Sequence, residues 1–289
     1  MQGEIVAEKL AFPEGPVWHD GVLYFVEIAS GAVARFRPGH GVERFALPGG
    51  GPNGAALGPD NVFYITQNGG MTRENRRTPS IQHLALDHDG HDGHAGHAAQ
   101  TAHDGLVSEL TREVAGLTLG APNDLAFGPD GRLYFTDPRG YPDPARNKQP
   151  GRIFAWDMAR SCGELVIELG AVFPNGIAFD REGTLYWSET FSRRVMALRD
   201  DKLELIVELP ERFFPDGFCI DQDGLLYVAS TYGHCVSVIE DGRVIERLMC
   251  GDGMPTNCCF AGTDLYVTES RHGTLWRFAI GKGGLPLHT

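Results

Sequence analysis

A short motif occurs six times along the chain, and it constrains the fold more than any other feature. Each copy is a proline, then one residue that is polar in every copy, then a short run of mostly apolar residues. The polar residues are Glu14, Asn53, Asn123, Asn175, Asp216 and Thr256, and each follows its proline directly. Most copies lie about 40 residues apart, the length of one four-stranded propeller blade. The repeat therefore predicts a β-propeller with one motif copy at the start of each blade.

A second strand is recognisable after each motif. It carries a tyrosine at the same place in every repeat, namely Tyr24, Tyr64, Tyr134, Tyr186, Tyr227 and Tyr266. Turn sequences such as Asp130-Gly131 and Asp223-Gly224 separate the first strand from the second, as tight hairpins require. Third and fourth strands follow, for example at 194–198 and 203–207. This order predicts blades of four antiparallel strands.

The last repeat has only three strands before the chain ends. The missing strand is expected at the N-terminus, because residues 4–10 resemble the fourth strand that precedes Pro215. An N-terminal strand that completes the last blade would close the ring and leave no long exposed sheet edge. We therefore predict an all-β, six-bladed propeller formed by a single domain, 1–289.

The second repeat is longer than the others because it contains a His- and Gly-rich insertion at about 87–104. Its histidines are His88, His91, His94, His97 and His103. Such spacing can bind zinc or nickel, but the composition favours a glycine-rich loop without regular structure. The loop is expected between the third and fourth strands of blade two, on the face opposite the motif residues.

Composition narrows the possible partners. The formal net charge of −13 argues against a nucleic-acid partner. No run of 18 apolar residues and no signal-peptide pattern is present, so we expect a soluble cytoplasmic protein without a membrane partner. The partner that we expect is a small-molecule substrate. The six cysteines have no Cys-x-x-Cys spacing and are expected to be buried free thiols.

The six motif residues are predicted to form a ring around the central channel, because the innermost strand of every blade lines the axis. Carboxylates that converge in a partly dry channel are costly unless a cation neutralises them. Oxygen ligands favour a hard divalent cation, Ca²⁺ first and then Mg²⁺ or Mn²⁺, with Zn²⁺ possible. The alternative is that Pro-Asn-Gly and Pro-Asp-Gly are only favoured turn sequences.

The chain resembles the senescence marker protein/gluconolactonase/luciferin-regenerating-enzyme family, which is related to diisopropylfluorophosphatases and paraoxonases. The resemblance rests on residues 14–18, 174–176 and 215–217 and extends over the whole chain. It implies that Glu14, Asn175 and Asp216 bind metal, and that Asn123 binds metal or metal-bound solvent and substrate. Sugar lactonases of the family often have an arginine where this chain has Ala121, so a sugar lactone is not implied.

The resemblance implies a metal-dependent lactonase, in which the cation polarises the carbonyl of the lactone and Asp216 activates water. Direct attack by Asp216, with a covalent intermediate, stays open. The same site could instead hydrolyse an organophosphate or phosphotriester, or act as a lyase or isomerase. A non-enzymatic binding propeller, with metal only plugging the axis, is a further alternative.

Loops near the ring supply candidate substrate contacts. Two long loops contain Arg73, Arg139 and Tyr141, and two shorter loops contain His234 and His272. Aromatic residues that could line the channel wall, or only pack the blades, are Trp18, Phe191, Phe213, Phe214 and Tyr232. A second set of polar residues ends each second strand, at Glu27, Gln67, Asp137, Glu189, Ser230 and Glu269, and most of these are expected to be solvated surface residues.

Overall fold

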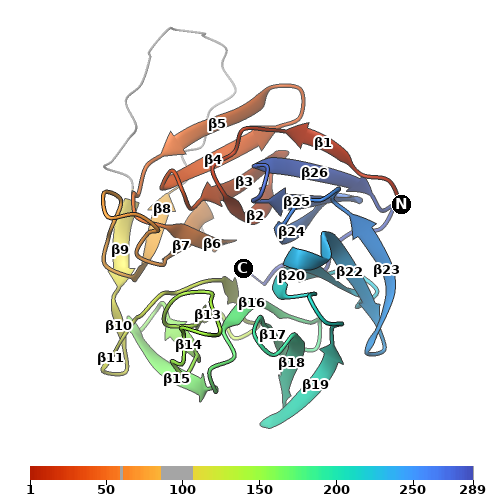
Figure 1. Ribbon diagram of the computed structural model, residues 1–289. Coiled ribbons are helices and arrows are strands. Elements are labelled where there is room, and N and C mark those ends of the chain that lie inside the picture. Colours follow the sequence, from red (N-terminus) through yellow and green to blue (C-terminus); the bar gives the residue numbers. More distant parts are fainter. Residues whose placement is uncertain (59–60, 86–106, 289) are drawn as a thin grey trace, which may run out of the picture.

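The computed structural model describes residues 1–58, 61–85 and 107–288, and these form six four-stranded sheets around a central axis (Figure 1). In each sheet neighbouring strands are antiparallel. The predicted six-bladed β-propeller is confirmed. The insertion at about 87–104 lies outside the described residues, between the third and fourth strands of blade two. No helix in the described part of the chain is long and apolar enough to cross a membrane.

The first three blades follow the chain in order. Blade one consists of β2 (Pro13–His19), β3 (Val22–Glu27), β4 (Ala32–Arg37) and β5 (Gly41–Ala46). Blade two consists of β6 (Pro52–Leu57), β7 (Val62–Gln67), β8 (Ser80–Ala85) and β9 (Val107–Thr111). A small hairpin, β10 (Glu113–Val114) and β11 (Leu117–Thr118), leads into blade three, which consists of β12 (Leu125–Phe127), β13 (Leu133–Asp137), β14 (Arg152–Asp157) and β15 (Cys162–Glu168).

The remaining blades repeat this plan. Blade four consists of β16 (Pro174–Phe179), β17 (Leu185–Glu189), β18 (Arg194–Arg199) and β19 (Lys202–Glu208). Blade five consists of β20 (Pro215–Ile220), β21 (Leu226–Ser230), β22 (Cys235–Glu240) and β23 (Arg243–Met249), with the short 3₁₀ helix η2 (Thr231–Gly233) after β21. Blade six consists of β24 (Pro255–Ala261), β25 (Asp264–Glu269), β26 (Thr274–Ala279) and β1 (Glu4–Ala7).

The N-terminal strand closes the ring, as the sequence predicts. β1 pairs antiparallel with β26, with Glu4 opposite Arg277. The Arg277 Nη1 also donates to Glu4 Oε1 at 2.6 Å. Two ends of the chain therefore share one sheet, and blade six is held by residues that are more than 270 positions apart in sequence.

The repeated tyrosine of the second strand packs each blade against the next one. Tyr134 of blade three meets Phe179 of blade four edge-on, with ring centroids 4.9 Å apart. Tyr227 and Phe260 make the same contact between blades five and six at 5.0 Å. Edge-to-face aromatic pairs add about 0.5–1.5 kcal/mol to the free energy gained by burial. The aromatic repeat therefore stabilises the interfaces that keep the inner strands in place.

Candidate functional site

The motif residues lie at irregular points of the innermost strands. The pairing register between the first and second strands shifts between Glu14 and Val17, and between Pro215 and Phe218. Blades two, four and six have the same irregularity at the same place. A bulge interrupts the alternation of a strand and can turn a side chain in a new direction. The bulges explain how motif residues can be directed toward the axis.

Three carboxyl groups interact across the channel, one each from blades one, three and five. They belong to Glu14, Asp124 and Asp216. Burial raises the pKa of Glu14 well above its ordinary value, and the charges of Asp216 and Asp124 raise it further. Burial raises the pKa of Asp216 to about 8, with Asp124 adding to the effect. Burial also raises the pKa of Asp124 to about 7. In the absence of a bound positive charge, these carboxyl groups therefore tend to retain protons at neutral pH.

Two amide side chains connect these carboxyl groups. Asn175 forms a hydrogen bond with Asp216, and its Nδ2 donates to Thr190 Oγ1 at 3.1 Å. Asn257 bonds Glu14, and its Nδ2 donates to Asp124 Oδ2 at 3.4 Å. The structure therefore brings together Glu14, Asn175 and Asp216 of the predicted set, with Asp124 and Asn257 beside them.

Sequence reasoning missed Asp124 and Asn257, although a signal was present. In the other four motifs the residue after the motif residue is glycine. Those glycines make room: a Cβ on Gly54 would lie 2.6 Å from Asp124 Oδ1, and one on Gly217 would lie 2.0 Å from Asn257 Cγ. The two non-glycine residues therefore fill the space at the axis, from blades three and six.

The remaining motif residues have other surroundings. Thr256 Oγ1 donates to the carbonyl oxygen of Pro13 at 2.9 Å and therefore ties blade six to blade one. Asn53 and Asn123 are buried. The backbone N–H of Asn123 donates to Thr136 O at 2.9 Å, and its carbonyl accepts the Thr66 hydroxyl. A metal or substrate contact by Asn123 stays a prediction.

Hydroxyl groups of one blade hold the motif backbone of the next. Thr136 Oγ1 in blade three donates to the carbonyl oxygen of Asn175 at 2.7 Å. Ser188 Oγ in blade four donates to the carbonyl oxygen of Asp216 at 2.6 Å. Both hydroxyl residues are fully buried. Each motif residue is therefore positioned by the neighbouring blade as well as by its own strand.

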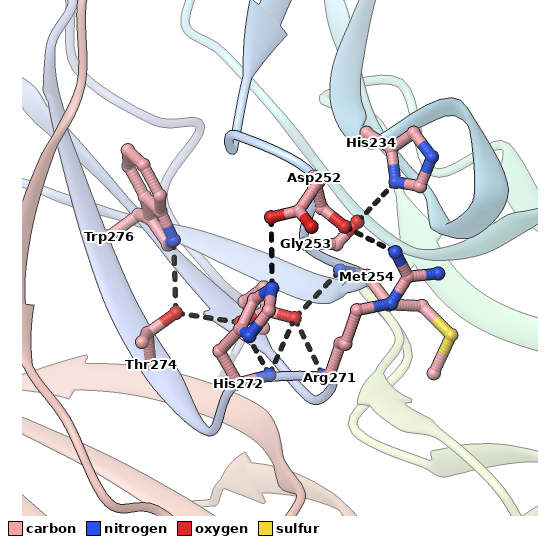
Figure 2. Close-up of polar contacts among 9 residues, drawn as sticks. His234, Asp252, Gly253, Met254, Arg271, His272, Thr274 and Trp276 are labelled. Carbon is pink, nitrogen blue, oxygen red and sulfur yellow. Dashed lines mark hydrogen bonds and ion pairs between the residues drawn. The ribbon is translucent and has the colours of Figure 1, made fainter.

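The polar residues that end the second strands are buried, so the expectation of surface solvation was wrong. Glu269 is fully buried, and its carboxylate accepts N–H bonds from Met254 at 2.7 Å and Arg271 at 2.6 Å, and a hydroxyl bond from Thr274 at 2.8 Å. The Met254 and Arg271 bonds end on Oε1 and the Thr274 bond ends on Oε2; Figure 2 shows the three donor residues and these bonds. The Met254 bond fixes the backbone just before Pro255, at the entry to the innermost strand.

Asp137 and Glu27 have the same role in other blades. Asp137 accepts the N–H groups of Gly120 and Ala121, both at 2.8 Å, just before Pro122. Glu27 accepts the N–H of Ala11 at 2.9 Å, just before Pro13. These carboxylates hold the loops that precede the motif, because a buried carboxylate is stabilised by several N–H donors.

Apart from Asn123, the predicted substrate residues lie on loops between second and third strands. Arg73 is exposed and Arg139 half-buried, and Tyr141 is 60% exposed with the Arg146 guanidinium 5.7 Å from its ring centre. His234 Nδ1 bonds Gly253 O at 2.6 Å, and His272 Nε2 bonds Asp252 Oδ1 at 3.0 Å (Figure 2). Within the described ranges, no hydrogen bond or ion pair joins these five residues to Glu14, Asn175 or Asp216. Their substrate role stays a prediction.

The two ends of the channel differ. We call the end with Glu14, Asn175 and Asp216 the motif end. At the other end, the far end, a cavity of about 380 Å³ is lined by apolar side chains such as Trp18, Phe179 and Phe260. Asp124 and Asn257 border this cavity. They therefore separate it from the motif end.

The C-terminal segment, residues 283–288, closes the far end. It contributes to the lining of the cavity, and the C-terminus lies at the centre of the ring (Figure 1). Leu285 N donates to Ile220 O at 2.9 Å, and Gln222 N donates to Gly283 O at 3.0 Å. His288 Nε2 bonds Asp180 O at 3.3 Å. Access to the ring from solvent is therefore expected from the motif end.

The donor set fits a hard divalent cation. In the described part of the chain, no three His, Cys, Asp or Glu side chains are grouped so that they could hold a metal ion by themselves. The predicted ligands are the carboxylates of Glu14 and Asp216 and the amide of Asn175, with Asn123 as a second amide candidate. They would bind a cation through amide oxygen as well as through negative charge. Carboxyl groups that retain protons because they lack a counter-charge favour a divalent cation, and the absence of sulfur and imidazole favours a hard one.

The fold and the site define the class of protein: a six-bladed propeller with a group of carboxyl and amide side chains at one end of its channel. Residues 12–271 match the SMP-30/Gluconolactonase/LRE-like region, and the chain belongs to this family. The chain is 25% identical over 150 residues to a gluconolactonase of Zymomonas mobilis, an alignment that covers 47% of this chain. It spans only 35% of the length of that relative.

Solved structures share the fold. A Xanthomonas campestris gluconolactonase is 24% identical, with a TM-score of 0.75 over 97% of this chain and 89% of that one. Regucalcin, a calcium-binding protein of Agrobacterium tumefaciens, is 19% identical, with a TM-score of 0.76 over 99% of this chain and 97% of that one. A luciferin-regenerating enzyme is 18% identical, with a TM-score of 0.75 over 99% of this chain and 97% of that one.

Proposed function

We propose that this protein is a divalent-metal-dependent hydrolase that opens a lactone ring. The observation that carries the proposal is the group of Glu14, Asn175 and Asp216 at the motif end. Asn175 forms a hydrogen bond with Asp216, and the charge of Asp216 raises the pKa of Glu14. Family membership and the similarity to gluconolactonases support the reaction class. The similarity to a calcium-binding protein supports Ca²⁺ as the first cation to test.

Glu14, Asn175 and Asp216 would hold the cation, and Asn123 is proposed to contact it or the substrate. The bound cation would polarise the carbonyl of the lactone and stabilise negative charge on its oxygen. Asp216 is proposed to take the proton of the attacking water. It is half-buried, whereas Glu14, Asn123 and Asn175 are buried, so it is the most accessible to solvent and substrate. Direct attack by Asp216 on the carbonyl carbon remains the alternative.

The experiment uses chelator-stripped protein and a panel of five- and six-membered lactones. Ca²⁺, Mg²⁺, Mn²⁺ or Zn²⁺ is added back singly, and ring opening is followed by acid release. We expect one cation to restore turnover. Asp216→Asn should lower kcat by about 10²–10⁴-fold with the fold unchanged, because it removes a general base.

A matched control separates this effect from a general loss of charge. Asp252→Asn is the same change on the same face, at a residue that is 83% exposed and paired with His272. It should leave kcat within about two-fold, because exposed pairs contribute little. No turnover with any cation, despite tight binding of one, would contradict the lactonase proposal and favour a binding propeller. Hydrolysis of phosphotriesters alone would favour the organophosphatase alternative.

A further inference from the structure

The residues directly before the motif prolines form a pattern of their own. They are large and apolar in four blades, at Phe12, Phe173, Phe214 and Met254, and small in the other two, at Gly51 and Ala121. The innermost strands run from the motif end to the far end, because the far cavity is lined by residues downstream of Glu14, such as Val17 and Trp18. Residues before the prolines therefore lie on the solvent side of the motif residues, at the opening of the channel. We call this opening the mouth.

These residues are close to the proposed ligands. Each lies two positions before a motif residue, and two residues of extended chain span at most about 7 Å. Phe214 precedes Asp216 in this way, and Phe12 precedes Glu14. Both side chains are half-buried, so part of each ring faces solvent. Apolar surface is therefore presented beside the group that carries the proposed chemistry.

Two of the four adopt an unusual backbone conformation. Phe12 has φ 61° and Phe173 has φ 58°. Bulky residues are rare in this left-handed region, and strain of this kind persists where the surrounding structure enforces it. The equivalent positions of blades one and four share it, and these blades supply Glu14 and Asn175. The repeated strain indicates that the placement of these rings is a specific feature of the mouth.

Two further aromatic residues extend the apolar surface. Phe191 packs on Phe173 with ring centroids 4.9 Å apart. Tyr232 meets Phe214 edge-on at 5.6 Å and is 56% exposed. We call Phe12, Phe191, Phe214, Tyr232 and Met254 the apolar collar; Phe173 is buried and packs against Phe191. It belongs to blades one, four, five and six, whereas the long loops of blades two and three bring Arg73 and Arg139.

We propose that the apolar collar binds an alkyl or aryl substituent of the substrate, so that the protein prefers lactones with an apolar side group over polyhydroxylated sugar lactones. The inference rests on the lactone-hydrolase function proposed above. Burial of a methylene group against apolar surface is favourable, whereas a polyol would lose hydration without polar partners there. Because the collar adjoins the proposed ligands, a lactone held at these ligands would place its substituent against the collar.

The test measures kcat/KM on cation-loaded protein for δ-valerolactone, for δ-lactones with unbranched side chains of increasing length, and for glucono-δ-lactone. We expect kcat/KM to rise about two- to four-fold per added methylene until the collar is covered. The alkyl lactones should exceed glucono-δ-lactone by at least about ten-fold. Tyr232→Ser and Phe191→Ser should each reduce the gain in kcat/KM per methylene.

Leu203→Ser is the matched control, since Leu203 is 55% exposed on the outer strand β19, and it should leave the chain-length series unchanged. Equal rates along the series, or a preference for glucono-δ-lactone, would overturn the collar proposal and leave the hydrolase function standing. If no lactone is opened, calorimetry with 2-alkylcyclopentanones tests the collar separately. Binding that tightens with chain length in the wild type, but not in Tyr232→Ser, supports the collar. The absence of such binding overturns it.

Discussion

The two ends of the channel are built from the same six strands but have opposite properties. At the motif end the strands are bulged, and carboxyl groups with raised pKa values are brought close together. At the far end the same strands present apolar side chains around a cavity that the C-terminal segment closes. Burial raises the pKa of the Cys219 and Cys259 thiols, which line that cavity. One repeat thus produces an end with ionisable groups, which suits chemistry, and an end with apolar side chains, which suits packing.

The largest loss of cation affinity and of kcat/KM is expected from a change at the motif end, Glu14→Gln. It removes one of the charges that would hold the cation, so cation affinity and kcat/KM should both fall by at least about 10–100-fold. Calorimetric titration with Ca²⁺ and lactone hydrolysis measure the two effects. Leu285→Ala, a change at the far end, should leave both values within about two-fold. Similar losses in the two variants would contradict the assignment of the chemistry to one end.

A second prediction concerns the pH dependence of cation-free protein. The pKa of Asp216 is raised to about 8 and that of Asp124 to about 7, so between about pH 4 and 8 the folded chain binds protons that the unfolded chain releases. The free energy of unfolding should therefore fall as pH rises through this window, by about 1.4 kcal/mol per pH unit for each such carboxyl group.

Thermal denaturation from pH 5 to 8, in chelator and then in excess Ca²⁺, measures this effect. We expect Tm to fall with pH in chelator and to be nearly constant with the cation, because bound charge replaces the protons. A Tm that rises with pH in chelator would show that the carboxyl groups are not forced together.

A third prediction tests the far end alone. A chain that ends at Lys282 loses the backbone bonds of Gly283 and Leu285 and the contact of His288 with Asp180. We expect the free energy of unfolding to fall by about 2 kcal/mol, since each bond contributes roughly 0.5–1.5 kcal/mol. Tm and kcat/KM are measured together. A fall in kcat/KM as deep as that of Glu14→Gln, without a change in Tm, would show that the C-terminal segment acts on the chemistry.

The last prediction concerns the contacts that position the motif, whose loss should have only a small effect on the cation site. Ser188→Ala removes the hydroxyl that donates to the carbonyl oxygen of Asp216. The free energy of unfolding should fall by about 1–3 kcal/mol, because a buried carbonyl is left without this donor. Urea denaturation measures it, and cation affinity should fall by less than in Glu14→Gln. Ser270→Ala is a suitable control because Ser270 Oγ makes only a 3.3 Å bond to Met254 O.

The sequence repeat was sufficient to predict the blades and their closure. Its period marks each inner strand, and the likeness of residues 4–10 to other fourth strands predicted the pairing of β1 with β26. Residues that break the repeat were harder to interpret. Asp124 and Asn257 occupy positions where the other blades have glycine, and only the closeness of the strands shows why they meet.

Local sequence pattern also gave wrong predictions for residues whose role depends on burial. Glu27, Asp137 and Glu269 were expected at the surface, but they are buried and accept backbone N–H groups of the segments that precede the motif. Trp18 was a candidate either for the channel wall or for blade packing, and the structure places it on the wall of the far-end cavity, stacked on Tyr266. A single sequence does not reveal which loop will donate to a carboxylate or which end of a channel a strand position will face.

The most direct test of the account is the release of protons when Ca²⁺ binds. Chelator-stripped protein in weakly buffered solution at pH 7 is titrated with Ca²⁺, while calorimetry records binding and a pH-stat records protons. The raised pKa values of Glu14, Asp124 and Asp216 predict release of about one proton or more per cation in the wild type, and less in Asp216→Asn. Binding of Ca²⁺ without proton release, or equal release in the two proteins, would contradict the claim that the motif end is the cation site.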